Sequence, residues 1–257
     1  MNPAPAAPPR GLPDRTRLRW AFLGAVALSV VLHLIQPWGR YVLYPFAVLC
    51  TWAHEMGHGL GAILVGGHFH KLVLRADLGG TAFHDVSGLA RPLVAAAGLL
   101  GPAIAGGLAI VIGARSERAA RNLLVFLAVS LLVSALVWVR PLWSFGFPAA
   151  VVLGGLFLGV ALSRVAWLEL FLVQLIGIQL CLGSLGDFDY MFSKGFERDG
   201  QYMLSDTATM AESWLLPYWV WGAVVAGSSL LILGLSFWWA WLRRPPSPSG
   251  WGAVVKR

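Results

Sequence analysis

Charged residues are scarce in this sequence. Only 12% of the 257 residues are charged, whereas 58% are hydrophobic, and the mean hydropathy is +0.71. Soluble domains carry about 25% charged residues, so this chain lacks roughly half of the usual charged surface. The composition therefore excludes an ordinary soluble protein and predicts a chain embedded in a lipid bilayer.

Cysteine is also scarce, and the sequence contains only Cys50 and Cys181. Both lie in apolar stretches, where cysteine behaves as a small hydrophobic residue, so the sequence predicts neither a disulfide framework nor a cysteine metal site. The 19 basic and 12 acidic residues give a net charge of +7. The basic residues gather at the termini and between apolar runs, which fits anionic lipid headgroups and speaks against nucleic acid as a partner.

Long apolar segments make up most of the chain. About 20 apolar residues are enough to cross a bilayer as a helix. Such windows occur at residues 19–38, 42–66, 91–114, 121–139, 142–163, 165–186 and 214–242. The sequence thus predicts an all-α polytopic membrane protein with about seven transmembrane helices in one domain, residues 19–242. The flanking segments 1–18 and 243–257 are rich in proline, arginine and serine, and we expect them to be disordered.

The basic residues also predict an orientation. An excess of arginine near the N-terminus places that end in the cytoplasm, and on this orientation the second helix runs inward, with its C-terminal end toward the cytoplasm. With seven spans, however, the arginines at 115, 118, 121, 243 and 244 fall on the other side and nearly cancel the bias. Either one segment is re-entrant or the number of spans is off by one.

Two segments between the apolar windows are long enough to have structure of their own. Residues 68–87 contain β-branched and aromatic residues on both sides of Gly79-Gly80, which predicts a short β-hairpin. Residues 187–213 are mixed and polar, with Ser205-Asp206 placed to cap a short helix that reaches Glu212.

The chemistry depends on one pentapeptide in the second apolar window, His54-Glu55-Met56-Gly57-His58. In a helix this H-E-x-x-H pattern puts both imidazoles on one face, where they can hold one Zn²⁺ while the glutamate activates water. Ionisable residues at membrane depth cost roughly 2.5 to 3.5 kcal/mol each, and a bound metal would offset that cost. The alternative is that these side chains hydrogen-bond one another with no metal present. Gly57, Gly59 and Gly61 would let a neighbouring helix approach closely, for a shared metal or for packing alone.

A catalytic zinc usually has three protein ligands, so one more must come from elsewhere in the chain. The carboxylates Asp187, Asp189 and Asp206 follow the sixth apolar window. Because the second and sixth helices run in the same direction, Asp187 is expected on the same side and at a similar depth as His58. Asp187 is therefore the first choice for the third ligand, with Asp189 and Asp206 as alternatives.

Several segments together resemble the site-2 protease family of intramembrane zinc metallopeptidases, and most closely its compact bacterial, B-like branch. They are Ala53 to Gly59, Gly66-Gly67, the predicted hairpin with Gly79-Gly80-Thr81, Ala97-Gly98 to Pro102, Ser184 to Asp187, Ser205-Asp206 and Leu216 to Trp219. The resemblance implies His54, His58 and Asp187 as ligands of one Zn²⁺ and Glu55 as the general base. The Asn-Pro…Leu-Asp-Gly signature of better-known members is missing, so Asp189 and Asp206 remain open as ligands.

The resemblance implies an intramembrane zinc metalloendopeptidase that cuts a membrane-tethered protein substrate, in the bacterial plasma membrane. The hairpin at 68–87 would hold an unwound substrate by strand addition, or else have only a structural part at the interface. The PDZ or CBS regulatory modules of some relatives are missing from the sequence, which leaves no visible device for gating, and a separate regulatory subunit is left open as a partner. Two other functions are open: a catalytically silent scaffold or regulator, and a metal-ion transporter whose histidines and aspartates bind the metal in transit.

Overall fold

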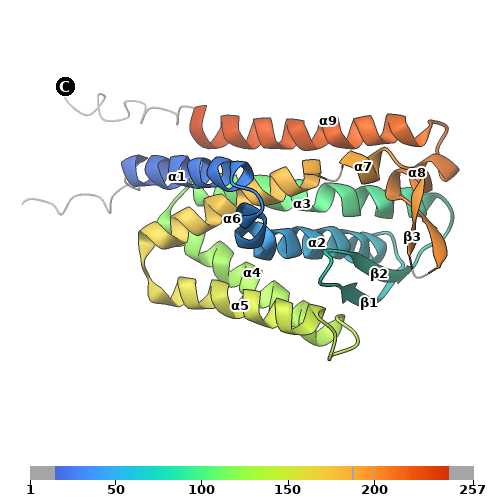
Figure 1. The fold of residues 1–257 in the computed structure, drawn as a ribbon, viewed down its shortest axis with the longest axis horizontal. Helices are drawn as coiled ribbons and strands as arrows, with labels where there is room; N and C mark the ends of the chain where they lie inside the picture. Colours follow the sequence, from blue (N-terminus) through green and yellow to red (C-terminus); the bar gives the residue numbers. More distant parts are fainter. Residues whose placement is uncertain (1–14, 187, 199, 243–257) are drawn as a thin grey trace, which may run out of the picture.

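The protein is mostly helical. The computed structural model describes residues 15–186, 188–198 and 200–242, and Figure 1 shows a bundle of long helices with short strands gathered at one end. The long helices are α1 (Arg15–Leu34), α2 (Trp38–Leu64), α3 (Arg91–Gly113), α4 (Glu117–Val137), α5 (Gly146–Ser163), α6 (Ala166–Gly186) and α9 (Tyr218–Phe237). The predicted all-α polytopic fold is confirmed.

Six of the described helices are long and apolar enough to cross a membrane: α1, α3, α4, α5, α6 and α9. Helix α2 is longer than any of them but contains the polar pentapeptide, and it is not among the six. Helix α1 begins at Arg15, inside the segment expected to be a disordered tail. The remainder of that tail, residues 1–14, and the tail 243–257 lie outside the described residues.

Helix α3 lies at the centre of the bundle, between α2 and α6, and glycines make this close packing feasible. A Cβ atom on Gly57 would collide with the carbonyl oxygen of Ala97, and one on Gly61 would lie 2.8 Å from the Ala97 side chain. Gly59 instead faces the ring of Phe69 in the first hairpin. The close approach expected at Gly57 and Gly61 is thus used against α3, which fixes the pentapeptide against a second helix.

Helices α1 and α2 point toward the same end of the bundle (Figure 1). Gly24 lies against Phe171, and five residues later Ser29 Oγ accepts a hydrogen bond from Gln179 Nε2 at 2.9 Å, so α1 and α6 run in the same direction. Cys50 of α2 lies against Gly183 near the end of α6. The expectation that α2 runs back toward the starting side of α1 is wrong, because apolar windows give helix lengths but not the path of the turn at residues 35–37.

Two antiparallel hairpins lie at the end to which α2 points. The strands β1 (His68–Leu74) and β2 (Gly80–Asp85) confirm the predicted hairpin, and the backbone of Leu72 also pairs with residues 138–140 beyond α4. The strands β3 (Gly195–Arg198) and β4 (Gln201–Leu204) form a second hairpin that the sequence does not predict. They lie between the short helices α7 (Phe188–Met191) and α8 (Asp206–Ser213).

Candidate metal centre

Helix α2 brings His54, Glu55 and His58 to the hairpin end of the bundle. The two histidines are one helical turn apart, and their Nε2 atoms lie 3.0 Å from each other. Glu55 and His58 are buried, with 6% and 8% of their surface exposed, and His54 is half-buried. The spacing predicted from the pentapeptide is therefore present, with both imidazoles facing one point.

Asp206 completes this group. Its Oδ2 atom lies 3.2 Å from Nε2 of His54 and 3.3 Å from Nε2 of His58. Within the described parts of the chain, these three side chains are the one set of His, Cys, Asp or Glu residues that could share a metal ion, with one ligand atom from each lying within 4.8 Å of the others. The structure thus brings together the two predicted histidines and one of the alternative carboxylates.

The other two predicted carboxylates differ in position. Asp189 is exposed on α7 and does not belong to the group. Asp187, the first choice from the sequence, lies outside the described residues. Asp206 is placed by the cap of α8, since Ser205 Oγ accepts a hydrogen bond from the backbone N–H of Ala208 at 3.2 Å. The predicted capping role of Ser205-Asp206 is confirmed, and the cap fixes the residue that completes the centre.

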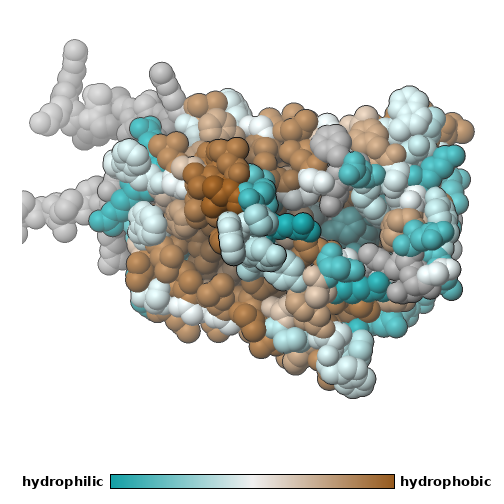
Figure 2. Space-filling model, viewed as in Figure 1, coloured by the Kyte–Doolittle hydropathy of each residue, from teal (hydrophilic) through white to brown (hydrophobic). Residues whose placement is uncertain are grey.

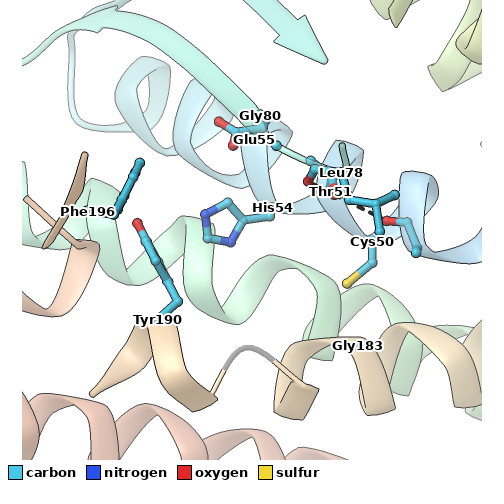
Figure 3. A pocket seen from close by; sticks show the side chains of 11 residues that line it. Cys50, Thr51, His54, Glu55, Leu78, Gly80, Gly183, Tyr190 and Phe196 are labelled. Carbon is cyan, nitrogen blue, oxygen red and sulfur yellow. Dashed lines mark hydrogen bonds between the residues drawn. The ribbon is translucent and has the colours of Figure 1, made fainter. Parts of the chain in front are cut away.

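Hydrogen bonds behind the three side chains fix their orientation. Nδ1 of His58 donates to the carbonyl oxygen of Val94 at 3.0 Å, which leaves the lone pair of Nε2 directed at the centre. The hydroxyl of Tyr190 donates to Oδ2 of Asp206 at 3.0 Å and accepts from the Asp206 backbone N–H at 3.2 Å. In Figure 3, Tyr190 reaches from α7 toward the space beside His54. Such partners hold metal ligands ready before the metal binds.

Electrostatics favour the ionised form of Asp206. Burial alone raises the pKa of this carboxyl group. When the two imidazoles are protonated, their charges and their hydrogen bonds to the carboxylate outweigh burial, so the pKa of Asp206 falls well below its usual value. The pKa of Tyr190 is raised by burial and by the neighbouring Asp206 charge, which keeps its hydroxyl a proton donor. Asp206 is therefore an anion held by a neutral donor, as a metal-binding carboxylate requires.

Two glycines make room for the reactive side chains. A Cβ atom on Gly80 would collide with the carboxylate of Glu55, and one on Gly98 would collide with the ring of His58. Gly80 belongs to strand β2 and Gly98 to helix α3. The glycines in two of the segments that carry the family resemblance thus have a direct steric role at the centre.

Two cavities meet at the centre and share the walls formed by Glu55, His54, Tyr190 and Phe196. One, of about 290 Å³, follows α2 to Cys50 and to Gly183 at the end of α6 (Figure 3). The other, of about 240 Å³, also reaches His58 and Asp206 and extends along the side of β2 toward His84 and Arg91. Tyr190 and Phe196, which sequence reasoning missed because no short pattern marks them, therefore separate two spaces on either side of the reactive groups.

Comparison with models of protein families shows to which family this chain belongs. The family model described as peptidase M50B-like matches residues 24–236, which include the whole centre, all of α2 to α6, the second half of α1 and α9 up to Ser236. The chain belongs to the peptidase M50B-like family. The resemblance to site-2 proteases is thereby confirmed. Comparisons with curated proteins and with solved structures found no match. This M50B-like protein is an integral membrane protein of a metallopeptidase family.

The donor set of the M50B-like chain fits zinc. Catalytic zinc sites combine three nitrogen or oxygen ligands with one position left for water or substrate, and two imidazoles with one carboxylate is a common set. His54, His58 and Asp206 supply these atoms, and the orienting bonds from Val94 and Tyr190 are of the kind that accompanies such ligands. These residues would hold the metal.

Proposed function

We propose that this protein is an intramembrane zinc metalloendopeptidase that hydrolyses peptide bonds in or near the transmembrane segments of membrane-tethered proteins, in a bacterial plasma membrane. The observation that carries the proposal is the position of Glu55, a buried carboxylate beside three converging metal-binding side chains at the junction of two cavities. A metal-storage site needs ligands but no such base.

The metal ligands and Glu55 would have separate roles in the reaction. When bound, Zn²⁺ supplies a Lewis acid that polarises the scissile carbonyl and makes water more acidic. Glu55 accepts a proton from the attacking water and returns it to the leaving amine. The backbone of Gly80 in β2 lies directly against the Glu55 carboxylate and restricts its orientation. Because Glu55 must both accept and return a proton, its carboxylate has to lie next to the metal ligands without being a ligand itself.

Strand β2 is the part of the fold that would hold the substrate. Peptide bonds in a helix are already hydrogen-bonded, so a transmembrane segment must unwind before cleavage. The Leu72 backbone of β1 is paired on its outer side with residues 138–140, whereas Thr81, Ala82 and His84 of β2 line the cavity beside the centre. An unwound segment would add to β2 as an extra strand, next to Glu55.

The decisive experiment replaces Glu55 with glutamine. Purified wild type should hold about one zinc per chain and cleave a single-pass membrane protein in liposomes, whereas Glu55→Gln should keep the zinc and lose cleavage, because the amide cannot accept a proton. Glu212→Gln, the same change at an exposed position of α8, is the control and should keep both. Wild type without metal would end the proposal.

The same preparation separates the two other functions. A transporter would move zinc across sealed vesicles and would do so equally well in Glu55→Gln, since transport needs ligands and no general base. A silent scaffold would bind zinc in both proteins and cleave nothing in either. A separate regulatory subunit, if the protein depends on one, would raise the cleavage rate of the wild type on addition of native membrane extract and leave Glu55→Gln inactive.

A further inference from the structure

Strand β2 carries a histidine that does not belong to the metal-binding group. His84 is half-buried, and the centroid of its ring lies 6.3 Å from that of His58, with an angle of 27° between the two ring planes. It lines the cavity of about 240 Å³ together with Glu55 and Asp206, but it is not one of the three side chains that could share a metal ion. His84 therefore lies beside the reactive groups without being a ligand.

The alternation of side chains along β2 turns His84 toward the centre. Successive side chains of a strand point to opposite faces. The neighbours Phe83 and Asp85 are exposed, whereas His84 is half-buried. Gly80, four residues earlier and on the same face as His84, lies directly against the carboxylate of Glu55. The face of β2 that includes His84 is thus the one turned toward the reactive groups.

The ring of His84 has a nitrogen atom that is still free to form a hydrogen bond. Nδ1 is buried and has no hydrogen-bond partner among the described residues. By contrast, Nδ1 of His58 donates to the carbonyl oxygen of Val94. The hydroxyl of Tyr190 is also committed, because it donates to Asp206. Buried polar atoms are nearly always paired in folded proteins, so this nitrogen needs a partner, and a substrate in the cavity can supply it.

Peptide hydrolysis produces an anion that needs hydrogen-bond donors. When water attacks a peptide carbonyl, the carbonyl oxygen becomes negatively charged, and preorganised donors stabilise that charge. The carboxylates of Glu55 and Asp206 already bring negative charge to the same cavity. An imidazole has at least one N–H group whether it is neutral or protonated, so His84 can donate in either state.

Two other side chains in the same wall are less suited to this task. Oγ1 of Thr81 on β2 donates to the carbonyl oxygen of Gly80 at 2.6 Å. Arg91, the first residue of α3, is exposed, and water weakens its attraction for an anion. The half-buried ring of His84 combines an uncommitted nitrogen with a place close to Glu55.

The surface around this cavity is polar. Figure 2 shows apolar side chains across the middle of the visible face and polar ones gathered at the hairpin end. The hairpins, and with them His84, lie at that end (Figure 1). Water, the second reactant of hydrolysis, is therefore available on the side of the bundle where His84 faces the centre.

We propose that His84 is a catalytic residue whose imidazole N–H donates a hydrogen bond to the negatively charged oxygen of the tetrahedral intermediate. His84 keeps its proton throughout, because the proton that moves comes from water and passes through Glu55. This role rests on the proposed protease function. The hydrogen bond is stronger to the anion than to the uncharged carbonyl of the substrate, so its loss lowers kcat and leaves KM nearly unchanged.

The kinetics of three variants test this role with the single-pass membrane protein in liposomes. Removal of one such donor typically lowers kcat by about 10²–10³-fold, and we expect this loss for His84→Ala. His84→Gln keeps an N–H donor and should recover part of the rate. His70→Ala is the control, since His70 pairs with Asp85 on the exposed side of the hairpin, and it should cleave like the wild type. All three variants should keep the zinc content of the wild type.

Binding of a transition-state analogue gives a second measurement that needs no turnover. A peptide that spans the cleavage site found with the wild type is made with a phosphinate in place of the scissile bond, so that it carries a tetrahedral anion. In a background of Glu55→Gln, His84→Ala should weaken binding of the phosphinate by about the same factor as it lowers kcat. Binding of the unmodified peptide should not change.

Other roles of His84 predict different results, and each of them overturns the proposal. Loss of zinc in His84→Ala would make His84 a metal ligand, and a higher KM with unchanged kcat would make it a residue that only binds substrate. A wild-type rate in His84→Ala would leave the protease function intact and end the role of His84. If the wild type binds zinc and cleaves nothing, the protease function fails and this role with it. Should His84→Ala not fold, His84→Leu, which fills more of the space without a donor, takes its place.

Discussion

The two halves of the metal centre come from regions of different architecture. Helix α2 supplies His54, Glu55 and His58 from within the bundle, where glycine contacts hold it against α3. Asp206 comes from residues 188–213, a segment of two short helices and a small hairpin outside the transmembrane helices. The first half is fixed by helix geometry and close backbone packing, while the second combines the burial of Met191 and Met210 against α3 and α9 with individual hydrogen bonds.

The bonds of that second half are few and specific. Thr207 Oγ1 donates to the carbonyl oxygen of Met191 at 2.8 Å, and Ser205 Oγ donates to that of Ser193 at 2.6 Å. Together with the Tyr190 hydroxyl they tie α8 to α7. Because the ligand lies at the start of an eight-residue helix and not inside a long one, we expect zinc to contribute more to the order of this segment than to that of α2.

Loss of a histidine ligand should have the largest effect. His58→Ala removes one of the two zinc ligands on α2. Zinc affinity should therefore fall by more than the 10–100-fold typical of changes to the hydrogen-bond partners of ligands, and cleavage should be lost as well. Zinc per chain after dialysis against a weak chelator measures this. His68→Ala, an exposed histidine of β1, should leave the zinc content unchanged. Equal zinc loss in both variants would mean that the effect is not specific to the centre.

Asp206→Ala should come next, with loss of zinc and of cleavage but a smaller fall in affinity than for His58→Ala, because water can occupy the open side of the centre. Asp189→Ala and Asp187→Ala are the matched changes, and both should keep the zinc. Normal zinc content in Asp206→Ala combined with loss in Asp187→Ala would restore the ligand first expected from the sequence. Zinc affinity by competition with a chromophoric chelator ranks all three.

Gly98→Ala tests the packed half without touching a ligand. The new methyl group would collide with the His58 ring, so the ring or α3 must move, and overpacking of this kind costs about 1–3 kcal/mol. We expect a lower thermal unfolding midpoint and weaker zinc binding. Gly155→Ala on α5 is the control, since an added Cβ there meets no atom within 4 Å. Equal stability of the two variants would show that α2 and α3 adapt more freely than their contacts suggest.

The difference between the two halves of the metal centre also explains which of its residues could be predicted from the sequence. The helices and the pentapeptide are local patterns, because apolar length and one-turn spacing can be read within a single segment. Asp206 joins His54 and His58 only through the path of residues 188–213, and the sequence could do no more than offer it beside Asp187 and Asp189. The second hairpin was missed because its strands have only four residues each and every residue of β4 is exposed, so no alternation of buried and exposed residues marks it.

The predicted direction of α2 was wrong for a related reason. Hydropathy predicted about seven transmembrane helices, and all seven are present nearly within the predicted bounds, although α2 is not among the six that are apolar enough to cross a membrane. Hydropathy could not show that α1 and α2 run the same way, since this depends on pairings of Gly24 with Phe171 and of Ser29 with Gln179.

Tyr190→Phe should have the smallest effect and is the finest test of the hydrogen-bonded half. It removes one hydroxyl and keeps the ring, whose centroid lies 5.7 Å from that of Phe196, so only the two bonds to Asp206 are lost. Loss of such an orienting partner typically lowers metal affinity by about 10–100-fold. Tyr202→Phe, an exposed tyrosine of β4, should change nothing. Because the histidines do not depend on this hydroxyl, Tyr190→Phe should still bind zinc at saturating metal, with a faster zinc dissociation rate. An unchanged dissociation rate would mean that α8 holds Asp206 through its cap alone, and the two halves would then be equally preformed.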